Sequence, residues 1–374
     1  LSKIEREVLL TFPQGPSRYL LLKKKKYNGL LKKLKLTFPK LADIYLLESL
    51  KQLNLGHEAI NKAPHITRLL KTKYPKKRVI QSTLKLDYQK DLTQILKRYI
   101  NSLAQYGIKN AASFVIRAST GDIITYIGSK DFYNDEISGQ VDGLQALRPP
   151  GSTLKPFIFG LGIEQGHIIP KSIVFDGPLS FRTPENFDRE FKGNITIEDA
   201  LIFSRNTPAV YINAKLSHPS LYEYLVSQGI HIPHPKGYYG SSIALGGLDL
   251  TAIDIASLYL NLANNGALTD IKYLKESRPA KIVKSKTELI QFGMSPSSSV
   301  MVKDMLRKNP RPNGKSTAGI EEQKGHVYWK TGTSFGFRDA WAVGIWGDMV
   351  ILTWVGDFIP CLLYTSDAAD DSLR

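Results

Sequence analysis

Residues 148–157 read RPPGSTLKPF, and this stretch decides how the rest of the chain is interpreted. Two prolines and a glycine interrupt the chain, and a helical apolar pattern begins at Ser152, runs to Gln165 and meets a C-cap candidate at Gly166. A spacing of three places Ser152 and Lys155 on one face of this helix, about one turn apart. Ser-x-x-Lys alone is common in long chains, where it marks a capped helix with a surface lysine, so its meaning depends on what accompanies it.

A serine and a lysine at this spacing suit nucleophilic catalysis. A serine hydroxyl is a poor nucleophile until a base takes its proton. Lys155 can be that base only when it is neutral, and lowering a lysine pKa by about 3 from its reference near 10.4 costs ~4 kcal/mol. Burial, a second cation and a helix N-terminus all favour the neutral form. We therefore expect a catalytic Lys155 to have such surroundings.

A second motif, Ser204-Arg205-Asn206, follows a segment that the Thr-x-x-Asp pattern at Thr196 predicts to be a capped helix. By itself a Ser-x-Asn tripeptide indicates no more than a turn in a loop. Its middle residue is a bulky cation. The Arg205 guanidinium could raise the positive potential that lowers the pKa of Lys155, or it could face solvent, and the sequence favours neither.

The third motif is Lys330-Thr331-Gly332-Thr333, which leads into a predicted C-terminal hairpin. Side chains alternate along a strand, so Thr331 and Thr333 share one face. Two hydroxyls and a nearby ammonium suit a carboxylate, and Gly332 lets a substrate backbone lie close to the strand. The plain alternative is an edge strand that happens to carry a lysine.

In this order the three motifs resemble those of penicillin-binding proteins and serine β-lactamases. RPPGSTLKPF is similar to the acylation motif of the bifunctional (class A) penicillin-binding proteins, and KTGTSFGFRDAWAVG, from Lys330 to Gly344, is most similar to the subtype called 1C. The resemblance covers roughly residues 77–358. Residues 1–18 resemble the end of the preceding glycosyltransferase domain, but its catalytic glutamates have no match, so glycosyl transfer is not expected.

The resemblance implies a serine-type D,D-transpeptidase. Ser152 would attack the penultimate D-Ala carbonyl of a peptidoglycan stem peptide, release the last D-Ala and form an acyl-enzyme. Lys155 would accept the serine proton, and Ser204 and Lys330 would relay it toward the leaving amine. An amine of a neighbouring stem would then attack the ester and complete a cross-link. Penicillin and other β-lactams would acylate Ser152 and stay bound.

The same resemblance implies the groups that hold the substrate. Asn206 would bond to the amide of the acyl chain, and Thr331, Gly332 and Thr333 would line the substrate carboxylate. The backbone N–H groups of Ser152 and Thr333 would form an oxyanion hole. No metal and no organic cofactor is implied. A D,D-carboxypeptidase or other hydrolase with this site, and a non-catalytic β-lactam sensor, are the alternatives.

The apolar patterns around the motifs predict an α+β fold. Short apolar runs at 112–117 and 123–127, and at 341–346 and 349–355, flank turn residues and predict two hairpins. A further extended run is predicted at 79–85. Helical patterns occupy most of the chain between the hairpins. The expected architecture, shared with the resembled family, is an antiparallel sheet flanked by helices plus a helical subdomain.

Charge divides the chain into unequal parts. Residues 1–100 hold 23 basic and 7 acidic side chains, whereas residues 101–374 hold 27 of each. We expect a basic linker with a glycosyltransferase remnant at 1–75, a transpeptidase domain at 76–359, and a non-native tail at 360–374 that lacks any core pattern. The lysine run 23–26 predicts contact with an anionic membrane surface or, equally, a solvated helix face.

Several classes of function are excluded or disfavoured. One cysteine rules out a disulfide framework and a multi-cysteine metal site. His231 and His234 share a spacing with metal ligands but lie between prolines without a carboxylate, which favours a surface loop. Nucleic acid is not an expected partner, because no nucleic-acid motif is present. The chain begins with Leu, so we expect a fragment of a bacterial inner-membrane protein whose anchor is absent and whose catalytic domain faces the periplasm.

Overall fold

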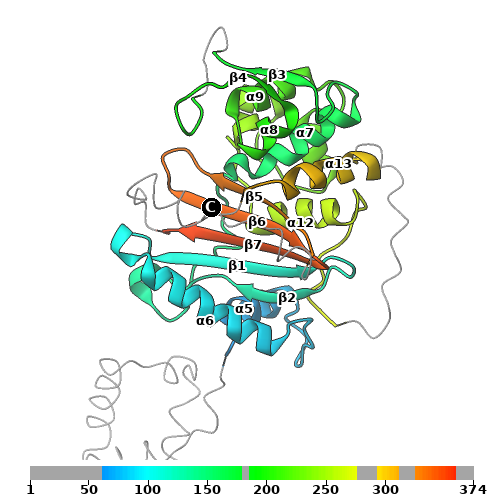
Figure 1. Cartoon of the computed structure of the whole chain (residues 1–374). Coiled ribbons are helices and arrows are strands. Elements are labelled where there is room, and N and C mark those ends of the chain that lie inside the picture. Colours follow the sequence, from blue (N-terminus) through cyan, green and yellow to red (C-terminus); the bar gives the residue numbers. More distant parts are fainter. Residues whose placement is uncertain (1–60, 179–184, 276–292, 311–324, 359–374) are drawn as a thin grey trace, which may run out of the picture. The chain divides into compact units, whose positions relative to one another are not determined.

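The computed structural model describes residues 61–178, 185–275, 293–310 and 325–358, and its described part from Lys62 onward belongs to one compact unit. Five antiparallel strands form the central sheet, in the spatial order β2-β1-β7-β6-β5 (Figure 1). The strands are β1 (Asn110–Arg117), β2 (Ile123–Ile127), β5 (Val327–Thr333), β6 (Asp339–Trp346) and β7 (Met349–Gly356).

Both predicted hairpins are confirmed. β1 pairs with β2, and β6 pairs with β7, in each case antiparallel. The early and late halves of the chain meet where β1 pairs with β7, with Phe114 opposite Leu352. The strand that carries the Lys-Thr-Gly motif, β5, therefore lies at one edge of the sheet, with β6 as its partner.

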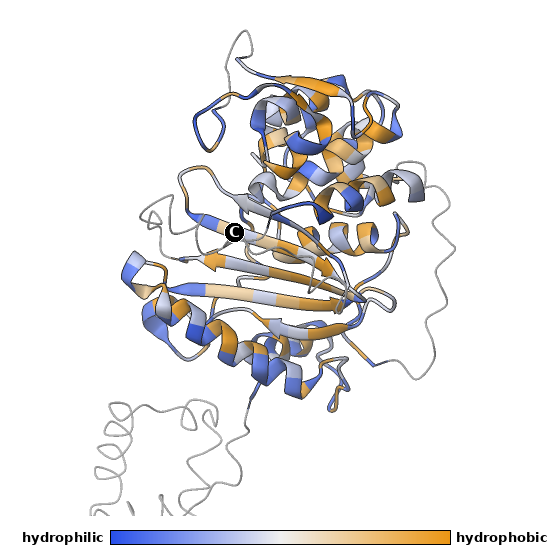
Figure 2. Ribbon diagram, viewed as in Figure 1, coloured by the Kyte–Doolittle hydropathy of each residue, from blue (hydrophilic) through white to orange (hydrophobic). Residues whose placement is uncertain are grey.

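One face of the sheet is covered by the helix α6 (Leu86–Ser102), which contacts β1 and β2. Apolar and polar residues alternate along α6 in Figure 2, and its apolar side packs on the strands. Leu96 and Ile100 belong to a buried cluster with Ala111 of β1 and Val355 of β7. This packing keeps water from that face of the sheet.

The opposite face carries the main core and the helices α5 (Pro64–Lys73), α7 (Lys155–Glu164), α12 (Ala252–Ala263) and α13 (Pro296–Arg307). Every residue of α7 from Lys155 to Ile163 is buried, so this helix lies at the centre of the molecule rather than on its surface. α12 begins with a capping box between Thr251 and Asp254.

A helical subdomain continues beyond α7 (Figure 1). It contains the helices α8 (Ile197–Ile202), α9 (Asn206–Lys215), α10 (Leu221–Ser227) and α11 (Lys236–Tyr239), and the short antiparallel pair β3 (Ile173–Asp176) and β4 (Gly193–Thr196). Short 3-10 turns complete the described structure: η3 (Ala104–Tyr106), η4 (Asp135–Ile137), η5 (Gly151–Leu154) and η6 (Gly240–Leu245). The α+β architecture of a sheet flanked by helices with a helical subdomain is thus as predicted.

Two expectations differ from the structure. The run 79–85 forms no continuous strand: Ser82 makes an isolated bridge with Leu274, and the Lys85 N–H donates to Ile124 O of β2 (3.0 Å). The compact unit begins at Lys62 rather than after residue 75, because α5 packs on β2 through buried residues such as Ile66. The predicted N-terminal segment up to residue 60 and the predicted non-native tail at 360–374 lie outside the described residues.

Candidate active site

Ser152 lies in the tight turn that precedes the central helix. Gly151–Leu154 form the 3-10 turn η5, and α7 begins at Lys155, so the first turn of the predicted helix is wound more tightly than an α-helix. The Trp341 indole donates to Pro149 O (3.0 Å), and the Tyr259 hydroxyl donates to Thr153 O (2.9 Å). Carbonyls on both sides of the half-buried Ser152 are thereby held by buried aromatic side chains.

The edge strand β5 packs directly on this turn through a glycine. A Cβ atom at Gly332 would lie 2.5 Å from Pro150 O and 2.9 Å from Thr153 N, closer than real side chains approach backbone atoms. The turn thus fills the space that a side chain at Gly332 would need, and the close approach of a substrate backbone to this residue stays a prediction. Gly151, at φ +55°, packs in the same way against Thr333 O. The nucleophile turn and the end of β5 therefore have little freedom to separate.

The Lys155 side chain is fully buried and points into the Ser-x-Asn turn. Its ammonium donates to Ser204 O (2.5 Å) and to Asn206 Oδ1 (2.6 Å), and lies 3.4 Å from Ser204 Oγ. Burial is the largest cause that holds the pKa of Lys155 well below its ordinary value, and the charges of Lys330 and Arg205 add to it. These surroundings are the ones that a lysine base requires.

Lys330 approaches the same serine from β5. Its ammonium donates to Ser204 Oγ (2.8 Å) and to Thr331 O (3.0 Å), and the residue is 2% exposed. The Ser204 hydroxyl therefore lies between the amino groups of Lys155 and Lys330 and can pass a proton from one side to the other. The structure brings together the four predicted side chains Lys155, Ser204, Asn206 and Lys330 by these contacts.

Thr331 and Thr333 are half-buried and alternate with the buried Lys330 and Gly332. This alternation confirms that the two threonines share a face of β5. Their binding of a carboxylate, and the oxyanion hole of Ser152 and Thr333, stay predictions.

The structure settles the alternative that Arg205 left open. The arginine is buried and does not face solvent. Its Nε donates to Asp176 Oδ2 (2.7 Å), and its Nη1 donates to Asp188 Oδ2 (2.7 Å). The guanidinium is therefore a fixed positive charge beside the Ser-x-Asn turn, and it contributes to the lowered pKa of Lys155.

Sequence reasoning missed two residues that hold the Ser-x-Asn turn, Asp176 and Asn186. Asp176 ends β3, and Asn186 accepts a hydrogen bond from the backbone N–H of Asn206 (2.7 Å). No local pattern marks either residue, because each meets the motif only through the fold. Asp339 and Trp341 also hold the nucleophile turn, since Asp339 pairs with Arg148 (2.8 Å) and Trp341 bonds to Pro149.

In the described part of the chain, no group of three or more His, Cys, Asp or Glu side chains is arranged to hold a metal ion. His234 stacks on the Tyr238 ring, with the ring centroids 4.1 Å apart. None of the helices within the described ranges is both long and apolar enough to span a bilayer.

Known proteins are similar to this chain in sequence. The family model "Penicillin binding protein transpeptidase domain" matches residues 111–348. Penicillin-binding protein 1C of Escherichia coli (strain K12) is 30% identical over 298 residues, which are 79% of this chain and 37% of that protein. Penicillin-binding protein 1F of Bacillus subtilis (strain 168) is 27% identical over 252 residues, 64% of this chain and 34% of that protein. The chain thus spans about a third of the length of these relatives.

Solved structures show the same fold. PonA1 of Mycobacterium tuberculosis, determined in complex with penicillin V, superimposes with a TM-score of 0.58 at 21% identity, covering 79% of this chain and 83% of that one. Penicillin-binding protein 1A of Haemophilus influenzae gives a TM-score of 0.54 at 19% identity, covering 71% and 47%. With the family model matching more than half of its length, the chain belongs to the penicillin-binding protein transpeptidase domain family.

Proposed function

We propose that this chain is a serine D,D-transpeptidase of peptidoglycan synthesis. Ser152 forms an acyl-enzyme with stem peptides that end in D-Ala-D-Ala, and an amine of a second stem peptide receives the acyl group. Penicillin and other β-lactams acylate the same serine. Glycosyl transfer is not proposed for the chain.

A single observation carries this proposal. Lys155 and Lys330, from α7 and β5, both reach the hydroxyl of Ser204, at 3.4 and 2.8 Å. Acyl transfer from an amide needs a base for the nucleophile and an acid for the leaving amine. Two lysines joined through one hydroxyl supply both, because a proton taken on one side can be given up on the other.

The reaction then proceeds as follows. Ser152 Oγ attacks the carbonyl carbon of the penultimate D-Ala, and its proton passes to neutral Lys155. The proton moves through Ser204 to the nitrogen of the last D-Ala as the C–N bond breaks. The acceptor amine then attacks the ester carbonyl, loses a proton to the same relay and releases Ser152. Thr331 and Thr333 hold the substrate carboxylate, and Asn206 orients the acyl chain.

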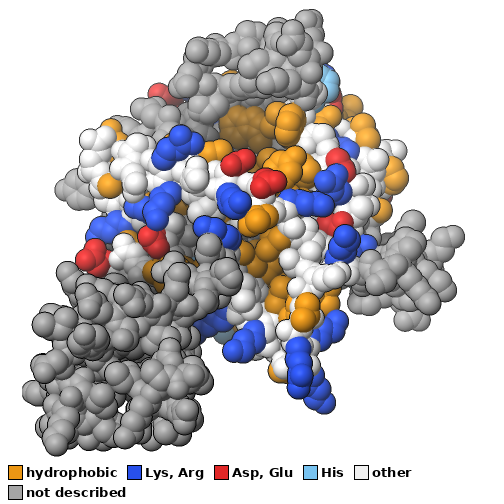
Figure 3. Space-filling view, turned by 90° about the horizontal axis from the view of Figure 1, so that it is seen from below, with side chains coloured by type: hydrophobic (Ala, Val, Ile, Leu, Met, Phe, Trp, Pro, Cys, Tyr) orange, Lys and Arg blue, Asp and Glu red, His pale blue; other side chains and the backbone are white. Residues whose placement is uncertain are grey.

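The setting of this activity is also a proposal. We place the catalytic domain on the outer side of the bacterial inner membrane, where stem peptides occur. Figure 3 shows Lys and Arg side chains spread over the face seen from below, between apolar ones. Every Lys and Arg of α5 and α6 is exposed, which fits the proximity of an anionic surface.

Covalent labelling with a fluorescent penicillin tests the proposal. The purified chain is expected to take up the label in a form that survives denaturation, and Ser152→Ala is expected to lose it. Ser119→Ala is a matched control on the hairpin between β1 and β2, where the Ser119 hydroxyl bonds only to Asp348. Labelling that persists in Ser152→Ala would falsify the assignment of the nucleophile.

A second assay separates transfer from hydrolysis and from sensing. The enzyme receives a D-Ala-D-Ala stem peptide with and without an amine acceptor, and the products are resolved by mass. A transpeptidase forms the cross-linked product in proportion to the acceptor. Release of D-Ala without cross-linked product would identify a carboxypeptidase, and the absence of any turnover by a labelled protein would identify a sensor.

A further inference from the structure

We propose that Asp176 and Arg205 are positioning residues for acylation: their buried ion pair holds the strained turn at Ser204 in place and joins it to the loop 185–192. This inference rests on the function proposed above. Neither residue touches the reacting atoms, and both act through Ser204, Asn206 and Lys155.

The turn at Ser204 needs to be held. Ser204 has φ +55°, in the left-handed region that a residue with a side chain rarely adopts, and such strain persists only where the surroundings enforce it. The Lys155 ammonium binds the Ser204 carbonyl on one side of this residue. On the other side, the Arg205 side chain is tied to Asp176, and the Asn206 backbone is tied to Asn186.

Asp176 is the centre of these contacts. Its carboxylate is completely buried at the end of β3 and accepts four hydrogen bonds, from Arg205 Nε (2.7 Å), Thr207 Oγ1 (2.6 Å), Asn186 Nδ2 (2.9 Å) and the Lys192 backbone N–H (3.1 Å). Burial opposes ionisation of Asp176, but these hydrogen bonds outweigh it and hold the pKa of the carboxyl below its ordinary value. Asp176 is therefore a fixed negative charge at neutral pH.

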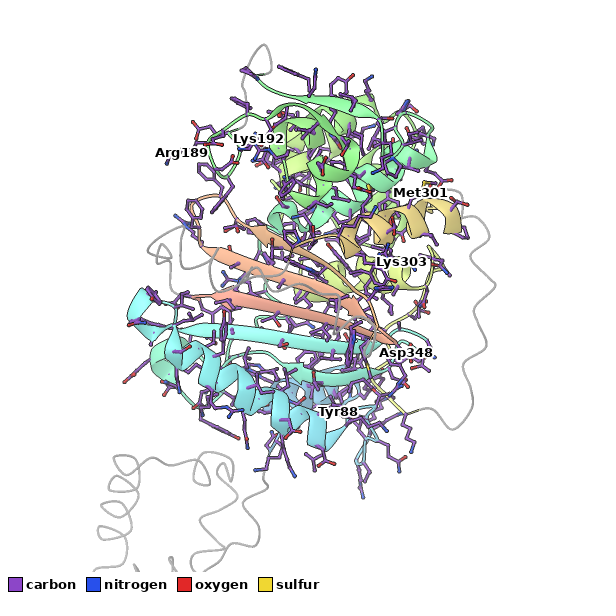
Figure 4. All side chains as sticks on the ribbon, viewed as in Figure 1. Tyr88, Arg189, Lys192, Met301, Lys303 and Asp348 are labelled. Atoms are coloured by element: carbon purple, nitrogen blue, oxygen red, sulfur yellow. The ribbon has the colours of Figure 1, made fainter. Side chains whose placement is uncertain are left out.

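The same arginine fastens the loop 185–192. Arg205 Nη1 donates to Asp188 Oδ2, and Nη2 donates to Glu190 O (2.5 Å). Figure 4 labels Arg189 and Lys192 on this loop, which lies beside the turn between β5 and β6. The Phe187 ring of the loop packs edge to face on the Phe337 ring of that turn, with the ring centroids 5.9 Å apart. The loop thus links the Ser-x-Asn turn to the end of the strand that carries Lys330.

The pair also acts on Lys155 through charge. The charged groups that bear on the Lys155 ammonium are Lys330 from β5, Arg205 from the turn before α9, and Asp176 from β3. Burial and both cations lower the pKa of Lys155, while Asp176 raises it. Loss of Arg205 and loss of Asp176 are therefore expected to move the ionisation of Lys155 in opposite directions, which a mere loosening of the fold does not do.

The test measures the second-order rate of acylation by fluorescent penicillin as a function of pH. Arg205→Met is expected to slow acylation about 10–100-fold at pH 7, as a small misplacement of reacting groups does. The acid limb of its pH–rate profile is the range in which the rate falls because Lys155 takes up a proton. This limb is expected to move to higher pH. Asp176→Asn also slows acylation, but its acid limb moves to lower pH.

Arg205→Lys separates charge from geometry. It keeps the positive charge but lacks the fork that reaches Asp176, Asp188 and Glu190 together. The expected result is a slowed rate with the acid limb near its wild-type position.

A double variant controls for the case in which the single variants fail to fold. A single substitution leaves one buried charge without its partner, which is often strongly destabilising, whereas Arg205→Met with Asp176→Asn leaves neither. The double variant is expected to acylate slowly, with its acid limb close to that of the wild type because the two charge effects oppose each other. Melting temperatures of all variants establish that folded protein is compared.

The matched control is Arg307→Met, which removes an arginine that pairs with Asp304 on α13 and is not among the charges that bear on Lys155. It is expected to acylate at the wild-type rate. A folded Arg205→Met or double variant with the wild-type rate would overturn the inference, as would acid limbs that move the same way in both single variants. A wild-type chain that takes up no penicillin would instead contradict the proposed function.

Discussion

Two lysines face one serine hydroxyl in this site, and their roles differ. Lys155 is placed as the base and is expected to be neutral in the active enzyme, since burial and two nearby cations lower its pKa. Lys155→Ala removes this base, so acylation by penicillin is expected to fall about 10²–10⁴-fold. The rate of covalent labelling measures the loss. A variant that acylates at the wild-type rate would show that another group takes the Ser152 proton.

Lys330 acts on Lys155 at a distance, as well as on Ser204 directly. Its positive charge is the second largest cause of the lowered pKa of Lys155. Lys330→Met removes that charge, so the pKa of Lys155 rises and the acid limb of the acylation profile moves to higher pH. The expected rate at pH 7 is lower for the same reason. An unchanged acid limb would show that the two lysines do not interact.

Arg205 illustrates how far single residues can be read from sequence. The Ser-x-Asn motif was recognisable, but whether its middle residue faces solvent depends on Asp176 and Asp188, which precede it on β3 and the loop that follows. Gly332 is a similar case. A glycine in a strand indicates a close approach, but the group that approaches is the Pro150–Thr153 turn, which the sequence does not identify.

Among the elements, β5 is positioned by its contact with the nucleophile turn. Gly332→Ala would place a Cβ 2.5 Å from Pro150 O, and the backbone must shift to relieve the clash. We expect a loss of about 1–3 kcal/mol in the free energy of unfolding, together with slower acylation. Gly344→Ala on β6 is the control, because its nearest contact would be 3.6 Å, to Trp329 Cβ. Equal losses in both variants would contradict the account of β5.

Helix α10 makes a prediction about stability and pH. Ser220 and Glu223 form a capping box, and hydrogen bonds from Ser220 are the main cause that lowers the pKa of Glu223 to about 2. A lowered carboxyl pKa contributes stability that is present above the unfolded value near 4.3 and is lost as pH falls toward 2. Ser220→Ala is expected to cost about 0.5–2 kcal/mol at pH 7.

Denaturant unfolding of the wild type and Ser220→Ala between pH 7 and pH 2 measures this contribution. The difference between the two proteins is expected to shrink as the pH falls, because the Ser220 hydroxyl, which donates to Glu223 (2.9 Å), stabilises the charged carboxylate more than the protonated carboxyl. A difference that stays constant across this range would show that the Ser220 hydroxyl contributes nothing through the charge of Glu223.

Elements with strong local patterns could be predicted, and those that depend on distant partners could not. Both hairpins and the cap at Thr196 carry their own turn or capping residues, and all three are confirmed. The run 79–85 is extended by its own pattern but forms only an isolated bridge at Ser82 and a few backbone hydrogen bonds. A strand needs a partner in space, and the sequence of the run does not contain that information.

At the scale of the whole molecule, the separation of charge is the feature that leads to a test. The first 100 residues carry 23 basic and 7 acidic side chains, and the remainder is balanced. An anionic surface attracts a basic segment with about 1 kcal/mol per Lys or Arg near it, an attraction that falls off within a Debye length. The full chain is therefore expected to float with vesicles that contain anionic lipid and not with neutral ones.

The lysines at 23–26 are the densest part of this charge. Changing all four to Gln is expected to weaken binding to anionic vesicles by two or more orders of magnitude, since four contributions of about 1 kcal/mol are lost. Changing Lys109, Lys215, Lys272 and Lys275 to Gln removes the same charge from the balanced part and is expected to leave binding nearly unchanged. Equal losses in the two variants would mean that net charge alone attracts the chain, and binding that persists at 1 M salt would mean that apolar contact, rather than charge, holds it there.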